Sequence, residues 1–247
     1  MNQPLEIFVD DWPNPAVVVI RSKSKWGNIS NYPTVYTFSL HEEFEEFAAS
    51  DKLMSVFLET SVDLLKESLN KLDNGNLELK VFGSTRTFWI PPVDQETLRK
   101  TEVTLPDGFQ FDELLPQEAE MVDSLWVHRF DGSVDHVRRF IVLMPNVCVR
   151  KSDGKLAGFA MVHDFMGNEV HLFTMPEFRG KRIAFNIEIA LAKKVLDHKL
   201  VPCKFVVTNN CAAMQMTLNS PYWKEMGSEI AWLQVVKPYL TRSSRQT

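Results

Sequence analysis

Two hydrophobic periods follow one another in the second half of the chain. Three short apolar runs, at 147–151, 156–165 and 169–175, are separated by the turn sequences SDG and MGN, which predicts three successive strands. The segment RGKR then opens a stretch in which apolar residues recur every third or fourth position, so we predict a helix of about 18 residues. The apolar stripe of this helix consists of Ile183, Ile187, Leu191 and Val195.

The remaining pattern predicts a mixed sheet flanked by helices. A polar stretch bracketed by prolines, residues 91–108, is interpreted as a linker between two halves. We therefore expect an N-terminal α/β domain over 1–103 and a second domain over 104–240, with a fold class of α/β built on an α+β mixed sheet. In the first half we predict strands at 16–21, 35–40 and 77–83 and helices at 41–50 and 57–72. In the second half we predict further strands at 109–114, 204–209 and 229–236 and helices at 116–127, 134–144 and 211–220.

Charge and composition narrow the classes of function. The 247 residues are 45% hydrophobic and 24% charged, as in an average globular protein. The formal net charge of −5 argues against a general binder of nucleic acid or anionic membrane, but it permits a local basic pocket. No run reaches the ~18 uninterrupted apolar residues of a membrane helix. Since the first residues also lack the apolar core of a signal peptide, we expect a soluble intracellular protein.

Cysteine and histidine spacing predicts no metal site. The three cysteines are far apart and form no CxxC pair, so neither a disulfide framework nor a zinc site is indicated, and a reducing compartment is the simplest home. The six histidines show no ligand spacing.

The junction between the last predicted strand of the series and the long helix has features suited to binding an anion. It has the sequence TMPEFRGKRIAF, in which the strand ends at Pro176 and a basic, glycine-containing turn leads into the helix. A helix N-terminus offers unpaired backbone N–H groups and the positive end of the helix dipole, which together favour a pyrophosphate. Gly180 lets the backbone approach an anion closely, and basic side chains surround it. An ordinary strand-to-helix turn with solvated basic residues is an equal alternative on spacing alone.

The same stretch resembles the coenzyme A pyrophosphate loop of the GNAT superfamily of N-acyltransferases, R/Q-x-x-G-x-G/A. Arg179 holds the first position and Ala184 the last, whereas Arg182 replaces the middle glycine and could either crowd or neutralise the pyrophosphate. Within the superfamily, the chain is more closely similar to the glycine N-acyltransferase family. Four collinear segments carry this likeness: DDWPNPAVVVI (10–20), VDSLWVHRFDGSVDHVRRFI (122–141), TMPEFR (174–179) and VPCKFVVTNNCAAMQM (201–216).

The resemblance implies a GNAT fold and the transfer of an acyl group from acyl-CoA, as co-substrate, to a small amine such as glycine or another amino acid. It implies that the strand EVHLFTM borders the pantetheine arm, with Phe173, Thr174 and Met175 lining the thioester. The family association suggests mitochondria, whereas an N-terminus that is neither arginine-rich nor acid-poor suggests the cytoplasm. The residues expected on the pyrophosphate side are Arg179, Gly180, Lys181, Arg182, Ile183 and Ala184.

The general base is the weakest point of the resemblance. The family's proposed glutamate corresponds to Ala212, and losing a base could cost on the order of a hundredfold in rate. We take Glu169 and His171, on the thioester-lining strand, as the candidate catalytic residues, with His163 and Asp164 on the neighbouring strand as further substitutes. Each has an alternative interpretation: Glu169 as a solvated strand start, and His171 as a structural histidine that faces the side opposite Val170 and Leu172.

Other candidate groups are assigned to packing. Tyr222 lies near the position of a leaving-group acid in many GNAT enzymes, with Trp223 closer to the usual register, and core or rim packing is favoured for both. Cys211 stands at a helix start, but an activated acyl-CoA needs no covalent intermediate. The run from Trp126 to Phe130 is expected to pack against the sheet or to border the acyl pocket.

Three hypotheses follow. The first is an acyl-CoA-dependent N-acyltransferase for a small amine, with glycine or another amino acid favoured. The second is a coenzyme A-binding GNAT-fold protein with weakened catalysis, which Ala212 and Arg182 favour. The third is acetylation of a protein or a polyamine, and the absence of an acidic cluster near the predicted site argues against a polyamine.

Overall fold

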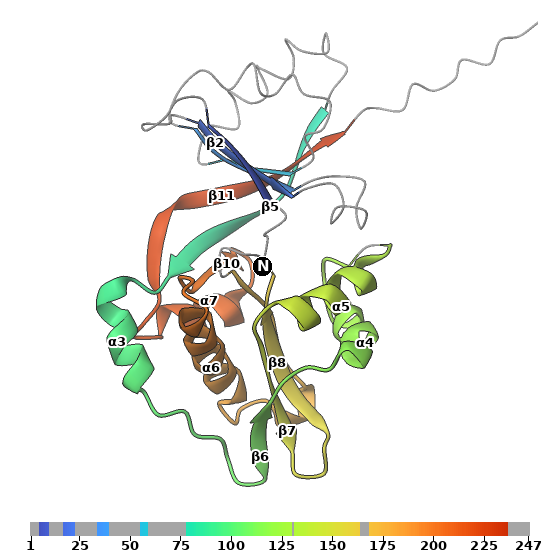
Figure 1. Cartoon of the computed structure of the whole chain (residues 1–247), viewed down its shortest axis with the longest axis vertical. Coiled ribbons are helices and arrows are strands. Elements are labelled where there is room, and N and C mark those ends of the chain that lie inside the picture. The colour runs from blue at the N-terminus through green and yellow to red at the C-terminus, as the bar shows by residue number, and fades with distance from the viewer. Residues whose placement is uncertain are drawn as a thin grey trace, which may run out of the picture. The chain divides into compact units, whose positions relative to one another are not determined.

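The computed structural model describes residues 83–129, 131–163 and 168–226 with their side chains, and the strands outside these ranges as backbone (Figure 1). The predicted helix at 41–50, and residues 59–72 of the helix predicted at 57–72, lie outside the described residues. None of the described helices has the length and apolar character to cross a bilayer.

The chain divides into two compact units. One combines 1–85 with 227–247, and the other runs from 86 to 226. This division differs from the boundary predicted at residue 103, because the predicted linker contains a helix, α3 (Pro92–Lys100). Leu98 of α3 is fully buried in the core of the second unit, which places the segment inside that unit.

In the first unit the strand order is β1-β2-β3-β4-β11-β5. The pairs β1–β2, β2–β3 and β4–β11 are antiparallel, and β3–β4 is parallel. The last two strands continue covalently into the second unit, where β5 also pairs with β10. The bounds are β1 (Leu5–Val9), β2 (Val17–Ser22), β3 (Thr34–Ser39), β4 (Ser55–Leu58), β5 (Glu78–Trp89), β10 (Cys203–Val207) and β11 (Lys224–Val236).

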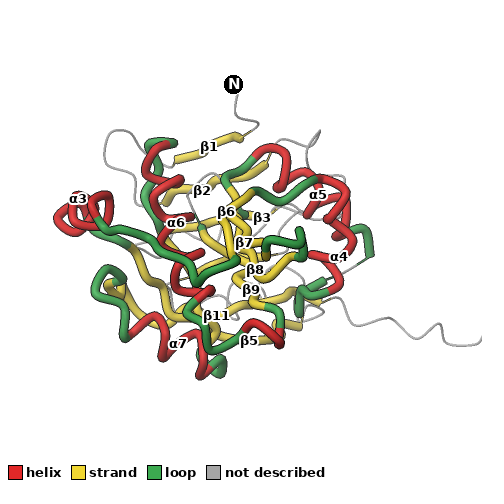
Figure 2. The backbone as a smooth tube through the Cα atoms, turned by 90° about the horizontal axis from the view of Figure 1, so that it is seen from below, coloured by secondary structure: helices red, strands yellow, loops and turns green. Residues whose placement is uncertain are grey.

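The second unit contains a four-stranded sheet of order β6-β7-β8-β9, in which all neighbours are antiparallel. Figure 2 shows these strands one after another, with α6 on one side of them and α4 and α5 on the other. The strands are β6 (Phe109–Asp112), β7 (Asn146–Lys151), β8 (Leu156–Val162) and β9 (Glu169–Thr174). The helices are η1 (Pro116–Glu118), α4 (Ala119–Ser124), α5 (Ser133–Leu143), η2 (Pro176–Phe178), α6 (Ile183–Asp197) and α7 (Cys211–Leu218).

Each face of this sheet buries its own apolar cluster. Val147 and Val149 of β7 face α6, whereas Cys148 between them faces α4 and α5, as strand alternation requires. The α6 stripe predicted from the sequence is confirmed, because its four members lie in the cluster on the α6 face. A third cluster packs the opposite side of α6 against α3, α7 and β10.

Most predicted elements of the second unit are confirmed, with shifts at their ends. The predicted helix at 116–127 is shorter in the structure and begins with a 3₁₀ turn, and α6 begins at Ile183 rather than near residue 180. Strand β4 occupies Phe57 and Leu58, where a helix was expected to begin, so that part of the prediction was wrong. Apolar spacing over a few residues does not separate a strand from a helix start.

Candidate functional site

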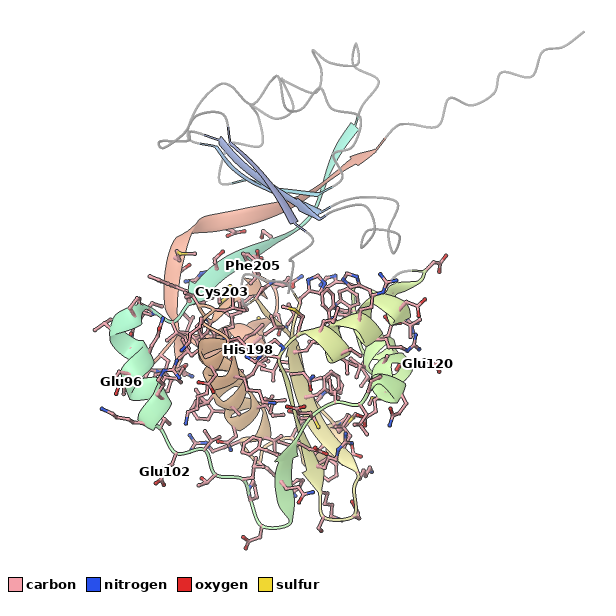
Figure 3. The ribbon with its side chains drawn as sticks, in the orientation of Figure 1. Glu96, Glu102, Glu120, His198, Cys203 and Phe205 are labelled. Atoms are coloured by element: carbon pink, nitrogen blue, oxygen red, sulfur yellow. The ribbon has the colours of Figure 1, made fainter. Side chains whose placement is uncertain are left out.

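The two sheets part at β9 and β10. These parallel strands share a single bridge, between Asn168 and Cys203, and beyond it β9 is the edge of the four-stranded sheet and β10 the edge of the other (Figure 3). In the described part of the chain, no strand pairs with the facing edge of β9 after this bridge. An edge strand presents backbone N–H and C=O groups to an extended partner. The region between the two diverging edges, called the opening below, is therefore bordered by an unpaired hydrogen-bonding edge of β9.

A β-bulge interrupts β9 next to this opening. Phe159 of β8 is opposite Phe173, and Met161 is opposite Val170, so β9 has one extra residue between the two pairs. His171 lies in the bulge with a φ of 56°, an unusual backbone conformation for a residue other than glycine.

The bulge overturns the predicted facing of His171. The prediction placed Val170 and Leu172 on one face and His171 on the other. Instead, Val170 joins the cluster on the α4 and α5 face and Leu172 the cluster on the α6 face, while His171 contacts Trp126 of the α4 end. The extra residue shifts the alternation by one, so the imidazole turns to the side of Val170.

The end of β9 approaches β8 closely at Gly158. A Cβ at this glycine would lie 2.8 Å from the carbonyl oxygen of Phe173 and 3.1 Å from Cδ1 of Ile187. Any side chain here would push β9 away from β8. Gly158 thus fixes the position of the strand that borders the opening.

The three residues predicted to line a thioester have different surroundings. The Phe173 ring stacks on Phe159 at a centroid distance of 6.0 Å and is half-buried. The Oγ1 of Thr174 is buried and has no hydrogen-bond partner in the described part of the chain. Met175 continues the pairing with β8 through its N–H, which donates to Ala157 O at 2.9 Å. The unpartnered hydroxyl is the group here with unused capacity for a ligand.

The turn after β9 holds its backbone N–H groups open. A 3₁₀ turn, η2, is followed by Gly180 with a φ of 77° and by Arg182 with a φ of 58°, and α6 starts one residue later. Within the described residues, no backbone carbonyl accepts from the N–H groups of 180–185, whereas the N–H of Asn186 donates to Arg182 O in the first helical bond. Successive free N–H groups at a helix N-terminus form an anion site.

The basic side chains of this turn also have no acidic partner in the described part of the chain. Among the described residues, Arg179, Lys181 and Arg182 form no ion pair, and the one acid of the turn, Glu177, is paired with Lys155 at 2.8 Å. The Nε of Arg179 donates to Thr174 O at 3.2 Å, which ties the guanidinium to the end of β9. The charge of the turn is therefore available to an anion.

Two predicted loop residues have a restricted role. The side chain of Ile183 is 1% exposed and belongs to the core under α6, so only its N–H can face a ligand. Ala184, half-buried on the first turn of the helix, likewise offers its N–H.

Glu169 is not a solvated strand start. It follows Asn168 of the bridge, its side chain is buried with 8% exposure, and its Oε1 has no hydrogen-bond partner in the part of the chain described. Burial raises the pKa of Glu169 well above its usual value, the negative charge of Glu188 raises it further, and Lys204 lowers it. A buried carboxyl with a raised pKa beside the bridge where β9 and β10 part is a candidate for accepting a proton.

Sequence analysis missed Glu188 of α6 and Lys204 of β10. Both are buried, and they form an ion pair. The available signal was a charge between Ile187 and Ile189, in the most apolar part of the helix. The partner of such a charge comes from another element and cannot be read from the helix.

Histidines and aromatic rings gather on the α4 and α5 side of β9. The Nε2 atoms of His136 and His163 are 3.1 Å apart, and the rings of Trp126 and His171 have centroids 4.3 Å apart. Burial, followed by the charges of His163, His136 and His128, lowers the pKa of His171 to about 3. Its imidazole is therefore neutral at physiological pH, and such a weak base accepts a proton less readily than Glu169. Asp164 lies outside the described residues.

Of the groups assigned to packing from the sequence, the two aromatic residues before β11 do pack, whereas Val127, in the run that follows α4, is 87% exposed. Tyr222 and Trp223 are buried in the cluster between α6, α3 and β10, and the hydroxyl of Tyr222 is hydrogen-bonded to Thr101. Cys211 and Ala212 are exposed in the first turn of α7. Among the described residues, no group of histidines, cysteines and carboxylates is arranged to hold a metal ion.

Comparison with known proteins identifies the fold. No family model and no curated protein matches the sequence. A Drosophila protein of 13% identity has a TM-score of 0.73 over 94% of this chain and 80% of that chain. A GCN5-related N-acetyltransferase from Kribbella flavida has a TM-score of 0.54 at 11% identity, over 91% of this chain and 88% of that chain. For a GCN5-related N-acetyltransferase-like protein from Streptococcus suis the TM-score is 0.51 at 11% identity, over 95% and 90%.

Residues 83–229 therefore have the α+β fold of the GNAT type. This confirms the fold predicted for the second half of the chain. The splayed edge strands, the bulge and the N–H-rich turn define the candidate site in this chain.

Proposed function

We propose that the chain is an acyl-CoA-dependent N-acyltransferase for a small amine, with glycine or another amino acid as the favoured acceptor. One observation carries the proposal. The opening between β9 and β10 leads to a turn with free N–H groups, and the basic side chains of this turn have no acidic partner among the described residues. A ligand with an extended amide-bearing arm and a diphosphate matches the two parts together. The choice of acceptor rests on the sequence resemblance to glycine N-acyltransferases.

The chemistry assigns separate tasks to this chain's residues. Glu169 accepts the proton that the ammonium form of the acceptor must lose before its nitrogen can attack the thioester carbonyl. N–H groups on the open edge of β9 stabilise the developing oxyanion. Arg179 and the turn hold the diphosphate, and the neutral His171 offers a hydrogen bond rather than a charge.

Thiol release tests the proposal. The full chain is mixed with acetyl-, benzoyl- and longer acyl-CoA, each with and without glycine and a panel of other amines. We expect release that depends on an amine, with the acylated amine identified by mass spectrometry. No amine-dependent release from folded protein across the panel would refute the proposal.

Variants assign the roles. Arg179→Ala should raise the KM for acyl-CoA about 10- to 100-fold, since a charge-assisted hydrogen bond contributes about 1.5–3 kcal/mol. Lys100→Ala removes an exposed cation from α3 and is the matched control, with an expected KM like that of the parent. Glu169→Gln should lower kcat by about a hundredfold or more with little change in KM. An unchanged kcat would remove Glu169 as the base.

A second candidate function is coenzyme A binding with weak or no transfer. Ala212 favours it, because this exposed position of α7 corresponds to the family's proposed base. Calorimetric binding of CoA that is weakened by Arg179→Ala, without turnover on any amine, would establish this alternative.

A further inference from the structure

Three charged side chains from three elements are buried together where β9 and β10 begin. Glu169 of β9, Glu188 of α6 and Lys204 of β10 are 8%, 2% and 7% exposed. Exposed acids such as Glu96 and Glu120, labelled in Figure 3, lie at the periphery of the unit, as charged side chains ordinarily do. Burial of three charges in one place is costly unless they neutralise one another.

Lys204 forms an ion pair with Glu188. Its Nζ donates to Oε1 of Glu188 and lies 4.2 Å from the centroid of the Trp223 ring, so the ammonium is held between a carboxylate and an aromatic face. The second oxygen of Glu188, Oε2, has no hydrogen-bond partner in the part of the chain described. The pair is therefore neutral as a whole, with an unsatisfied carboxylate oxygen.

The third charge is in excess. With all three groups ionised the cluster would carry a net charge of −1, and Oε1 of Glu169 also lacks a partner among the described residues. A proton on Glu169 would bring the cluster to neutrality. Glu169 and Lys204 each follow a residue of the parallel Asn168–Cys203 bridge, and α6, which carries Glu188, packs on β9. The charges of Glu188 and Lys204 therefore act on Glu169 at close range.

We propose that Glu188 and Lys204 are positioning residues that control how readily Glu169 accepts a proton, with Glu188 opposing its ionisation and Lys204 favouring it. The inference rests on the proposed function, in which Glu169 is the general base. Neither residue of the pair touches the reacting atoms. Both act through Glu169, by charge.

The proton balance of the step shows why this control matters. The acceptor's ammonium group loses one proton to the Glu169 carboxylate, and its nitrogen lone pair forms the C–N bond at the thioester carbonyl. The C–S bond breaks, and the thiolate leaves with its electron pair. Glu169 then releases its proton to the thiolate or to solvent, so its proton affinity sets the pH range of the cycle.

A titration of Glu169 tests the inference without needing activity. The full chain is labelled with glutamate carrying carbon-13 in the side-chain carboxyl, and the Glu169 resonance is assigned by its loss in Glu169→Gln. In Glu188→Gln the midpoint should fall by about one to two pH units, and in Lys204→Met it should rise by a similar amount. Glu188→Asp keeps the charge and should restore the parental midpoint.

The rate profile is the second readout. The acidic limb of kcat/KM against pH for acyl transfer should move in the same directions as the titration. A merely structural pair would lower the rate at every pH and leave the limb in place. If Lys204→Met does not fold, Glu188→Gln and Glu188→Asp carry the test by themselves.

The possible results distinguish a failure of this inference from a failure of the proposed function. A Glu169 midpoint that stays unchanged in Glu188→Gln overturns the inference whether or not the protein is active. A moved midpoint with an unmoved rate limb overturns it too, because Glu169 would then not carry the proton of the reaction. Absence of turnover in the parent protein is a failure of the proposed function, and the thiol assay shows it independently of the titration.

Discussion

Charged side chains are buried at the start of β9 and exposed beyond its end. At its start, Glu169 is buried, and Lys204 and Glu188 form a buried ion pair. Beyond its end, Arg179 and Lys181 are exposed and have no acid partner among the described residues. The strand is six residues long, about 20 Å, and the Nε of Arg179 donates to the carbonyl oxygen of its last residue, Thr174.

This difference separates two uses of charge on one strand. Buried charges have few partners other than one another, so they interact strongly. They therefore affect the protonation of neighbouring groups and the stability of the fold. Exposed unpaired charges contribute little to folding and are available to a ligand. Substitutions at the start should therefore appear in stability, and those at the end in binding.

The largest expected effect is at the start of the strand. Lys204→Met leaves the Glu188 carboxylate buried and unpaired, which should lower the free energy of unfolding by about 3–5 kcal/mol. Urea denaturation at pH 7 measures it. The double variant Glu188→Gln with Lys204→Met removes both charges and should recover much of the loss. A single variant within 1 kcal/mol of the parent would show that the buried pair is not coupled.

Gly158 tests the other end of the strand through packing instead of charge. Gly158→Ala puts a methyl group 2.8 Å from Phe173 O, and the resulting displacement should destabilise by about 1–3 kcal/mol. The same denaturation experiment reports it. Gly83→Ala is the control, since a Cβ there meets nothing within 4 Å, and it should change stability by less than about 0.5 kcal/mol.

Two buried histidines that contact Trp126, His163 after β8 and His171 in the bulge of β9, should make stability depend on pH. Burial lowers the pKa of His163 to about 4 and of His171 to about 3, below the 6.5 of an unfolded histidine. The unfolded chain then binds more protons, so their stabilisation is complete above pH 6.5 and is lost as the pH falls toward 4. The slope is about 1.4 kcal/mol per pH unit for each histidine.

Melting temperatures between pH 4 and 7.5 measure this slope. His163→Phe removes one titrating group from the cluster and should flatten the curve. His198→Gln, at an exposed histidine, controls for the loss of a histidine as such. A curve for His163→Phe that runs parallel to the parental curve would contradict the assignment.

The smallest effect concerns the turn beyond the strand. Arg182 has a left-handed backbone, and Arg182→Gly should relieve this strain and stabilise by about 1 kcal/mol. Arg182→Ala loses the same charge but keeps the strain, so the difference between the two variants isolates the backbone. Calorimetry with CoA then shows the role of the guanidinium: weaker binding in both variants means that it neutralises the diphosphate, and tighter binding means that it crowds it.

Local patterns predicted the α6 stripe and the basic turn, because each depends on residues that are close in sequence. The helix α3 was missed although its signals were present. Prolines at its first positions are compatible with a helix, and Asp94 and Lys100 suit its two ends. The composition of this segment had been interpreted as a linker instead.

The facing of His171 and the Glu188–Lys204 pair could not be obtained in this way. Alternation assumes a regular strand, and one extra residue in β9 reverses it. The pair joins a helix to a strand 16 residues further along the chain, and only the packing of α6 against β10 brings the two charges together. Both are consequences of tertiary structure.

The single bridge between Asn168 and Cys203 has a consequence for cooperativity. Beyond it β9 pairs with β8 and β10 pairs with β5, and no further pairing between β9 and β10 exists among the described residues. A pantetheine-like arm between them would act as a missing strand and link their fluctuations. We therefore expect amide hydrogen exchange along β9 and β10 to slow together when CoA binds, because an occupied opening turns two independent edges into one cooperative element.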